Sequence, residues 1–308
     1  MSNSSGKRDS GDSKLFDFES YRNKKVQMIN RGLSRLIPKS GVRPATLHQA
    51  MRYSLFAGGK RIRPILCLAA AEACGGRPER ALHAACAVEC IHTYSLIHDD
   101  LPAMDNDDMR RGKPTNHKVY GEGVAVLAGD ALLTIAFESA AKSCPGKRYG
   151  CSDLIREIAE AGGSRKLIGG QVADLEAEGK PVTAAQLKYI HESKTSALLC
   201  CSVRLGGMLA DCSPARLKAL TDFGTNVGLA FQVIDDILDV TQSSQKLGKT
   251  AGKDAAVEKA TYPVVHGLEK SRATARRLTK KAFKALEIFE GKALALQALA
   301  EYLLDRDC

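Results

Sequence analysis

The amino-acid sequence predicts an all-α fold of about ten helices around one large core. Ala, Leu, Glu and Lys dominate long stretches from Phe16 onward, and alternating β-branched segments are scarce. Apolar residues recur at i, i+3 and i+4, and glycine or proline interrupts this pattern between segments of helical length. With 308 residues, of which 44% are hydrophobic, the chain is long enough to bury such a core.

Six segments carry enough apolar residues at helical spacing to place one face on the core. In chain order they are residues 81–98, 122–142, 152–179, 184–210, 214–240 and 269–304. The breaks around them are Gly58-Gly59, Gly75-Gly76, Pro102, Pro114, Pro145-Gly146, Pro181, Pro214 and Gly248. The stretches from Ala81 to Ile97 and from Ala197 to Leu209 are apolar on more than one side, which predicts interior helices, an oligomer interface, or both.

We expect one all-α domain over residues 15–308, because no repeat of fixed period interrupts the pattern. Residues 1–14 are rich in Ser and charge and lack an apolar run, which predicts a disordered tail. The longest charge-free run, Phe223 to Ile234, has 12 residues, whereas a bilayer span needs about 20, so stable membrane insertion is not expected. Ten cysteines without a CxxC pair indicate reduced thiols and a cytoplasmic location.

The first aspartate group consists of five aspartates within HDDLPAMDNDDMRR, between Asp99 and Asp108. A solvated acidic loop is one interpretation. However, the group follows an apolar helix end, so its first carboxylates emerge from a buried element, and this favours a hard divalent cation. Asp99 and Asp105 are six residues apart with Pro102 between them, so we expect a turn to bring Asp105 back towards Asp99.

The second aspartate group consists of Asp235, Asp236 and Asp239 in the apolar helix FQVIDDILDV. Asp235 and Asp239 lie about 40° apart around the helix and about 6 Å apart along it, so they share a face and destabilise the helix unless a cation intervenes. Two such groups, more than a hundred residues apart, predict a cavity with acids on opposite walls. Magnesium ions between them would bind a diphosphate, which supplies the missing negative charge.

The positive charge supports a diphosphate ligand. The chain has 45 Lys and Arg against 35 Asp and Glu, a net charge of +10. Candidate phosphate ligands are Lys60, Arg61, Arg63, Arg110, Arg111, Lys194, Thr195 and Lys249. A P-loop is rejected, because Ser243 stands where its first glycine belongs. Nucleic acid is not expected, because the chain has neither a DNA-binding motif nor an aromatic-interleaved basic stripe.

These residues, in this order, resemble the motif set of short-chain trans-prenyl diphosphate synthases. The motifs are GGKRIRP (58–64), IHTYSLIHDDLPAMDNDDMRRGKPTNH (91–117), AGD (128–130), KT (194–195) and FQVIDDILDVTQSSQKLGKTAGKD (231–254). The resemblance covers roughly residues 20–308 and is closest to bacterial-type farnesyl diphosphate synthases and their geranylgeranyl-forming relatives. It implies an all-α bundle around a deep central cavity, usually in a homodimer.

The resemblance also implies a role for each motif. About three magnesium ions would be held by Asp99, Asp105 and Asp235, and these three would be catalytic together with Asp100, Asp236, Asp239 and Lys194. The allylic diphosphate would be bound by Arg110, Lys194, Thr195, Gln232, Lys249 and Lys259. Isopentenyl diphosphate would be bound by Lys60, Arg63, His92 and Arg111. On its own, His92 would be interpreted as a core histidine.

Product length is expected to depend on Tyr94 and Ser95, which precede the first aspartate group by five and four residues. Tyr94 lies about 7.5 Å below Asp99 along the helix, although its phase also fits a plain core aromatic. A tyrosine there resembles the farnesyl-forming enzymes, so we expect farnesyl diphosphate, with geranylgeranyl diphosphate as the alternative. An alternative from another functional class is a catalytically silent regulatory subunit of the same fold. It is disfavoured because both aspartate groups are present.

Overall fold

The computed structural model describes residues 16–143, 146–241 and 261–304 and confirms the all-α fold. The first helices are α1 (Phe18–Leu36), α2 (Ala45–Leu55), α3 (Ile62–Ala73), α4 (Pro78–Asp99), α5 (Asn116–Tyr120), α6 (Glu122–Ala141), α7 (Cys151–Gly162) and α8 (Leu167–Ala177). There follow α9 (Ala184–Ile190), a π-helix (His191–Ser196), α10 (Ala197–Leu209), α11 (Pro214–Thr241), α13 (Tyr262–His266), α14 (Leu268–Ala285), a 3₁₀ turn (Glu287–Phe289) and α15 (Leu294–Leu304).

Two of the predicted segments are divided in the structure. Residues 152–179 form α7 and α8, because the backbone becomes extended at Gly163, which directly follows α7. Residues 269–304 form α14 and α15, because Glu290 and Gly291 between them have φ values of 50° and 80°. Neither an extended nor a left-handed residue continues a right-handed helix, so each pair of helices can pack at its own angle.

The centre of the bundle is formed by α3, α4 and α10. Most of their residues are buried, which explains why these helices are apolar on more than one side and confirms the predicted interior helices. Small residues let them approach closely. A Cβ atom added to Gly206 of α10 would lie only 2.1 Å from the backbone oxygen of Cys67 in α3. The central helices therefore form a rigid support for the elements at their ends.

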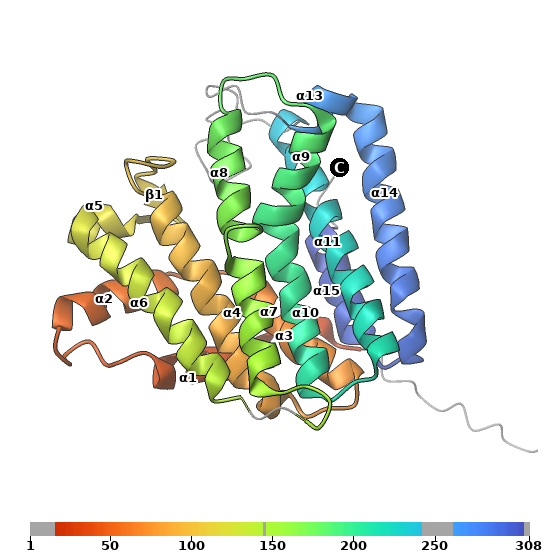
Figure 1. Cartoon of the computed structure of the whole chain (residues 1–308), viewed down its shortest axis with the longest axis horizontal. Coiled ribbons are helices and arrows are strands. Elements are labelled where there is room, and N and C mark those ends of the chain that lie inside the picture. Colours follow the sequence, from red (N-terminus) through yellow and green to blue (C-terminus); the bar gives the residue numbers. More distant parts are fainter. Residues whose placement is uncertain (1–15, 144–145, 242–260, 305–308) are drawn as a thin grey trace, which may run out of the picture.

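Both aspartate groups lie toward the same end of the bundle. The first begins where α4 ends, and it leads into the antiparallel pair β1 (Met109–Arg110) and β2 (Lys113–Pro114), in which Met109 is opposite Pro114. The second lies in the last part of α11. In Figure 1, β1, α9, α13 and the final turns of α11 are all near the upper end of the molecule. The π-helix packs between α8 and α11 at this end.

The structure also bears on the expectations about cysteines and membranes. The eight cysteines among the described residues are free, as expected for reduced thiols. In the same ranges, α6 is the one helix that is long and apolar enough to cross a membrane, judged by length and composition only. It packs against α4 and α2 and so forms a wall of the bundle.

Candidate active site

A tight turn follows α4 and folds the first aspartate group back on itself. The backbone N–H of Asp105 donates to the carbonyl oxygen of Asp99 at 2.8 Å, and that of Asp107 donates to the carbonyl of Asp100 at 3.2 Å. Asn106 has a φ of 49°, a conformation that asparagine tolerates better than most residues. The predicted return of Asp105 towards Asp99 is therefore present, and α4 ends before Pro102 as expected.

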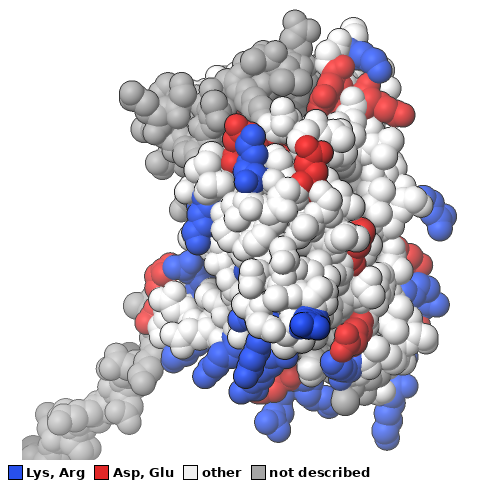
Figure 2. Space-filling view, turned by 90° about the vertical axis from the view of Figure 1, so that its left-hand side faces the viewer, with Lys and Arg blue, Asp and Glu red and all other residues white. Residues whose placement is uncertain are grey.

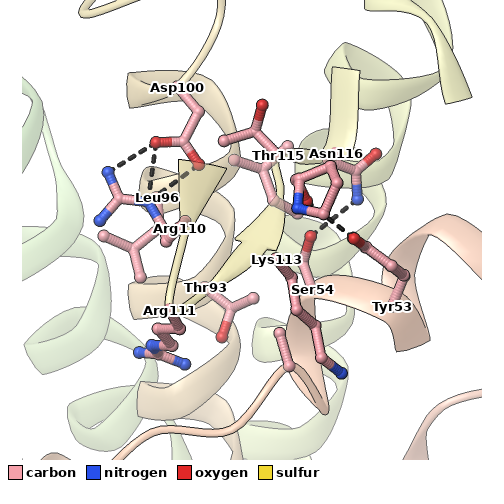
Figure 3. Close-up of a pocket in the computed structure, with 13 residues that line it drawn as sticks. Tyr53, Ser54, Thr93, Leu96, Asp100, Arg110, Arg111, Lys113, Thr115 and Asn116 are labelled. Carbon is pink, nitrogen blue, oxygen red and sulfur yellow. Dashed lines mark hydrogen bonds and ion pairs between the residues drawn. The ribbon is translucent and has the colours of Figure 1, made fainter. Parts of the chain in front are cut away.

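The carboxyl groups of this turn are crowded and partly desolvated. Burial, together with the nearby Asp105 and Asp100, raises the pKa of Asp99 to about 6 against the opposing charges of Lys194 and Arg110. Asp100 is buried and accepts hydrogen bonds from Arg110 Nε at 2.7 and 2.9 Å (Figure 3). It also forms an ion pair with Arg110 Nη2 at 2.6 Å. Arg110 thus neutralises Asp100, while Asp99 remains in a site that a cation would stabilise.

A small cavity lies behind the hairpin, between α2, α4 and the two strands. Its volume is about 30 Å³, and the Asp100–Arg110 pair forms one side of it (Figure 3). Tyr53 donates to the carbonyl of Pro114 at 2.7 Å and Asn116 donates to Ser54 at 2.7 Å, so α2 is fastened to the hairpin across this space. The volume suits one water molecule rather than a substrate.

Cationic side chains surround the turn between α2 and α3. Arg111 donates to the carbonyl of Gly58. A Cβ atom on Gly59 would lie 2.5 Å from the Arg111 guanidinium, and the φ of Gly59 is +115°, so only glycine allows this approach. Arg63 Nη1 lies 3.4 Å from His92 Nε2. Burial lowers the pKa of Arg63 to about 10, and burial together with Arg63 and Arg111 places the pKa of His92 well below its usual value. An anion bound here would relieve the repulsion.

Lys60 and Arg61 have different surroundings, although they are adjacent in the sequence. Lys60 is exposed, and its ammonium lies 5.2 Å from the ring centroid of Tyr302 in α15. Arg61 is buried and pairs with Glu89 of α4, with both side chains only 3% exposed. It also donates to the carbonyl of Leu55. Its grouping with the phosphate ligands was therefore wrong, because Arg61 ties α3 to α4 inside the core.

The π-helix supplies the opposite wall. Lys194 Nζ donates to Asp174 of α8 at 2.7 Å, and it also lowers the pKa of Asp99, so its charge reaches the first aspartate group. Thr195 Oγ1 donates to Gln232 Oε1 of α11 at 2.9 Å. Thr195 and Gln232, both predicted for the allylic diphosphate, are therefore bonded to each other, and Lys194 precedes Thr195 on the same π-helix. The π-helix itself is a form found mainly as single turns at functional sites.

The second aspartate group is divided by burial. Asp236 is buried and accepts from Gln232 Nε2 at 3.1 Å and from the backbone N–H of Tyr262 at 2.7 Å, while His191 Nε2 lies 3.3 Å from its Oδ2. Asp235 is partly exposed and Asp239 is exposed, on the shared helix face that their spacing predicted. Lys249 and Lys259 lie outside the described residues.

The oxygen donors fit magnesium, which binds one or two carboxylates together with phosphate oxygens. Among the described residues, no three acidic, histidine or cysteine side chains converge well enough to hold a metal by themselves. A substrate diphosphate would supply further oxygen ligands. The raised pKa of Asp99 is consistent with a carboxylate that lacks a full counter-charge.

The two residues predicted to set product length lie on different sides of α4. Tyr94 is 5% exposed, and its ring packs edge-on against His98 with centroids 5.7 Å apart. Its hydroxyl is buried and has no hydrogen-bond partner in the described part of the chain. Burial, with a contribution from Asp99, raises the pKa of Tyr94 to about 12. Ser95 donates to the carbonyl of His92 at 3.0 Å.

Comparison with known proteins decides the family. A family model for polyprenyl synthetase matches residues 44–299. The chain belongs to the polyprenyl synthetase family. This confirms the resemblance to short-chain trans-prenyl diphosphate synthases and, at that level, the activity of a prenyltransferase.

Relatives in the family share about half of their residues with this synthase. The chloroplastic geranylgeranyl pyrophosphate synthase of Capsicum annuum is 52% identical over 298 residues, which are 95% of this chain and 79% of that protein. The heterodimeric geranylgeranyl pyrophosphate synthase large subunit 1 of Arabidopsis thaliana is 51% identical over 94% of this chain and 80% of its own. A dimethylallyltranstransferase of Fischerella ambigua is 51% identical over 85% and 77%.

Solved structures of the family have the same fold as this synthase. The geranylgeranyl pyrophosphate synthetase from Pyrococcus horikoshii has a TM-score of 0.86 at 34% identity and covers 94% of this chain and 98% of its own. An FPP/GFPP synthase from Zymomonas mobilis has a TM-score of 0.84 at 34% identity, with coverages of 93% and 99%. The names of the curated relatives support the geranylgeranyl alternative better than the farnesyl product expected from Tyr94.

Proposed function

We propose that this synthase is a magnesium-dependent enzyme that condenses isopentenyl diphosphate with allylic diphosphates to give mainly geranylgeranyl diphosphate. The observation that carries the proposal is the position of both aspartate groups at one end of the bundle. The positive charge of Lys194 on the π-helix lowers the pKa of Asp99 in the first group, so this cation lies within electrostatic reach of that group. The choice of product rests on relatives at about 50% identity whose names are geranylgeranyl pyrophosphate synthases.

The allylic diphosphate would bind between α4, the π-helix and α11. Asp99, Asp105 and Asp235 would hold magnesium, which when bound neutralises charge on the diphosphate oxygens. Lys194 and Arg110 would donate to the same diphosphate, and their charges stabilise it as it leaves. Thr195 and Gln232 would orient it from the side.

Isopentenyl diphosphate would bind the cationic cluster of Lys60, Arg63, His92 and Arg111. The negative charge of its diphosphate would offset the mutual repulsion of Arg63 and Arg111, and both guanidinium groups would donate hydrogen bonds to the phosphate oxygens. His92, kept neutral by its low pKa, would donate one hydrogen bond without adding charge. The double bond of this substrate then attacks the allylic cation, and a proton is lost to the released diphosphate.

The proposed assembly is a dimer through the outer faces of α5 and α6. Val119, Val126 and Leu127 are 46%, 39% and 58% exposed. On this side of the molecule Figure 2 shows a broad area with few charged side chains. Exposed apolar side chains that lie together often mark a protein–protein interface. A second copy of this chain is proposed to cover these faces of α5 and α6. A related subunit is the alternative partner, since one relative is named as a heterodimer subunit.

A cytoplasmic location remains a prediction, and several relatives are named chloroplastic.

The decisive experiment combines turnover with product chromatography. The enzyme is incubated with isopentenyl diphosphate and dimethylallyl, geranyl or farnesyl diphosphate, with magnesium or EDTA, and the dephosphorylated products are separated. We expect magnesium-dependent formation of mainly the twenty-carbon alcohol. A main product of fifteen carbons would restore the farnesyl interpretation. If folded protein makes no product, the silent-subunit alternative is favoured.

A matched pair of variants tests the second aspartate group. Asp235→Asn should lower turnover at least about a hundredfold, the effect of losing one electrostatic stabiliser. Asp222→Asn is the control, because Asp222 lies on the same helix but forms only an exposed ion pair with Lys218. It should leave turnover unchanged. Equal losses in both variants would contradict a specific role for Asp235.

A further inference from the structure

Two pairs of side chains face each other where the π-helix meets α11. On the π-helix, His191 and Thr195 are four residues apart, and on α11, Gln232 and Asp236 are also four apart. Thr195 donates to Gln232 at 2.9 Å, Gln232 donates to Asp236 at 3.1 Å, and His191 Nε2 lies 3.3 Å from Asp236. Two hydrogen bonds and the close His191–Asp236 contact link the four side chains, here named the clamp.

The clamp determines the orientation of each member. Gln232 uses its oxygen for Thr195 and its nitrogen for Asp236, so its amide has one allowed orientation. Because a carboxylate only accepts, the proton must be on His191 Nε2. Asp236 thus accepts hydrogen bonds from Gln232 and from the backbone N–H of Tyr262, and its Oδ2 also faces His191 Nε2. Both carboxylate oxygens of Asp236 are therefore used within the protein.

The backbones on both sides of the clamp are in close contact. A Cβ atom on Gly228 of α11 would lie 2.6 Å from Ser196 Cα, and one on Gly170 of α8 would lie 2.4 Å from the backbone nitrogen of Lys194. The π-helix is therefore confined between α8 and α11. Since the backbones touch, small changes in the clamp must appear as rotations of the side chains.

We propose that His191 is a positioning residue for the allylic diphosphate. By holding Asp236, it fixes Gln232 and Thr195 on one side and the neighbouring Asp235 on the other. This inference rests on the proposed function, in which Thr195, Gln232 and Asp235 face that substrate. His191 touches neither the substrate nor a metal, so it acts through Asp236 alone. Partners of this kind typically change affinity or activity about 10- to 100-fold when removed.

A role in stability alone accounts poorly for a histidine at this position. His191 is 4% exposed, and its Nδ1 atom has no hydrogen-bond partner in the described part of the chain. A buried polar atom without a partner opposes folding. The ring packs against Tyr262 with centroids 6.1 Å apart, a contact that an aromatic hydrocarbon ring would make equally well. The Nε2 donor toward Asp236 is what distinguishes histidine here.

Two substitutions separate the donor from the ring. In His191→Gln the amide nitrogen reaches about the position of Nε2, whereas in His191→Asn it reaches only that of Nδ1. We expect His191→Asn to lower kcat about 10- to 100-fold and to raise the KM for the allylic diphosphate. The KM for isopentenyl diphosphate should stay unchanged, because Lys60, Arg63 and His92 belong to the opposite wall. His191→Gln should recover most of the loss.

The control is another buried histidine. His48 of α2 lies far from the clamp in sequence and bonds the carbonyl of Val42 through Nδ1 at 2.9 Å. His48→Gln should lose that bond, melt at a somewhat lower temperature and keep wild-type kinetic constants. The proposal is overturned if His191→Asn keeps wild-type kinetics, or if His191→Asn and His191→Gln lose the same activity. A wild-type enzyme without turnover would instead refute the proposed function.

Discussion

The partly buried carboxyl of Asp99 should make the metal-free enzyme less stable than it would be with a neutral side chain. We predict that Asp99→Asn, which keeps the shape and removes the charge, stabilises the protein in EDTA near neutral pH. Burial raises the pKa of Asp99 from 3.8 to about 6 in the folded state. The unfolded chain therefore releases the proton more readily than the folded protein does.

The pKa difference sets both the magnitude and the pH range. A difference of about two pH units corresponds to about 3 kcal/mol, or roughly 5–10 °C in Tm. Above pH 6, both states are ionised and the full penalty is present. As the pH falls from about 6 to about 4, the folded state is protonated first and the penalty fades. Below about pH 4, both states are protonated and the advantage of the variant disappears.

Thermal unfolding of the two proteins between pH 4 and pH 8, in EDTA, measures this difference directly. Asp222→Asn serves as the exposed control and should stay within about 0.5 kcal/mol of wild type. If Asp99→Asn melts with the wild type near pH 7.5, or if its advantage persists at pH 4, then Asp99 does not carry the desolvation cost that its burial indicates.

Three further predictions follow from buried contacts. Arg61→Ala leaves Glu89 charged without its partner and should lower the free energy of unfolding by about 3–5 kcal/mol, measured with urea; unchanged stability would contradict the structural role of Arg61. Arg204→Ala removes two hydrogen bonds of 2.6 and 2.9 Å to Glu157, so we expect the free energy of unfolding to fall by about 1–3 kcal/mol. The kcat should stay at the wild-type value, and a variant with reduced kcat and unchanged stability would contradict this prediction. Tyr94→Ala empties the volume of an aromatic ring and should shift the products to longer chains; if product lengths stay the same in folded enzyme, Tyr94 is only a core residue.

Features set by local spacing could be predicted from the sequence. The four-residue spacing of Asp235 and Asp239 places them on one face whatever surrounds the helix. Pro102 between Asp99 and Asp105 forces a turn for steric reasons. The apolar composition of 197–209 predicted an interior helix, and almost all of α10 is buried.

Features set by packing partners could not be predicted in this way. Arg61 directly follows Lys60 in the sequence, and both are basic. Arg61 is nevertheless buried, because Glu89 of α4 lies beside it and pairs with its charge. Asp174 and His191 were missed for the same reason. An acid in an otherwise apolar helix such as α8 was the available signal for Asp174, but its partner Lys194 is twenty residues away. The product length expected from Tyr94 stays a prediction, and the names of the relatives favour the geranylgeranyl alternative, because the walls of a product cavity come from several helices.

The π-helix has a consequence for which length changes the family can accept. Its wider turn takes up one residue more than an α-helical turn for about the same rotation, so α9 and α10 keep nearly the phase of one continuous α-helix. Deleting one residue between His191 and Ser196 would restore the ordinary pitch and leave α9 nearly in its present rotation, so the buried Leu187 and Ile190 would keep their contacts. Inserting a further residue would instead rotate α9 by about 100° relative to α10 and turn both side chains away from their contacts. This segment should therefore accept the loss of one residue far more readily than the gain of one.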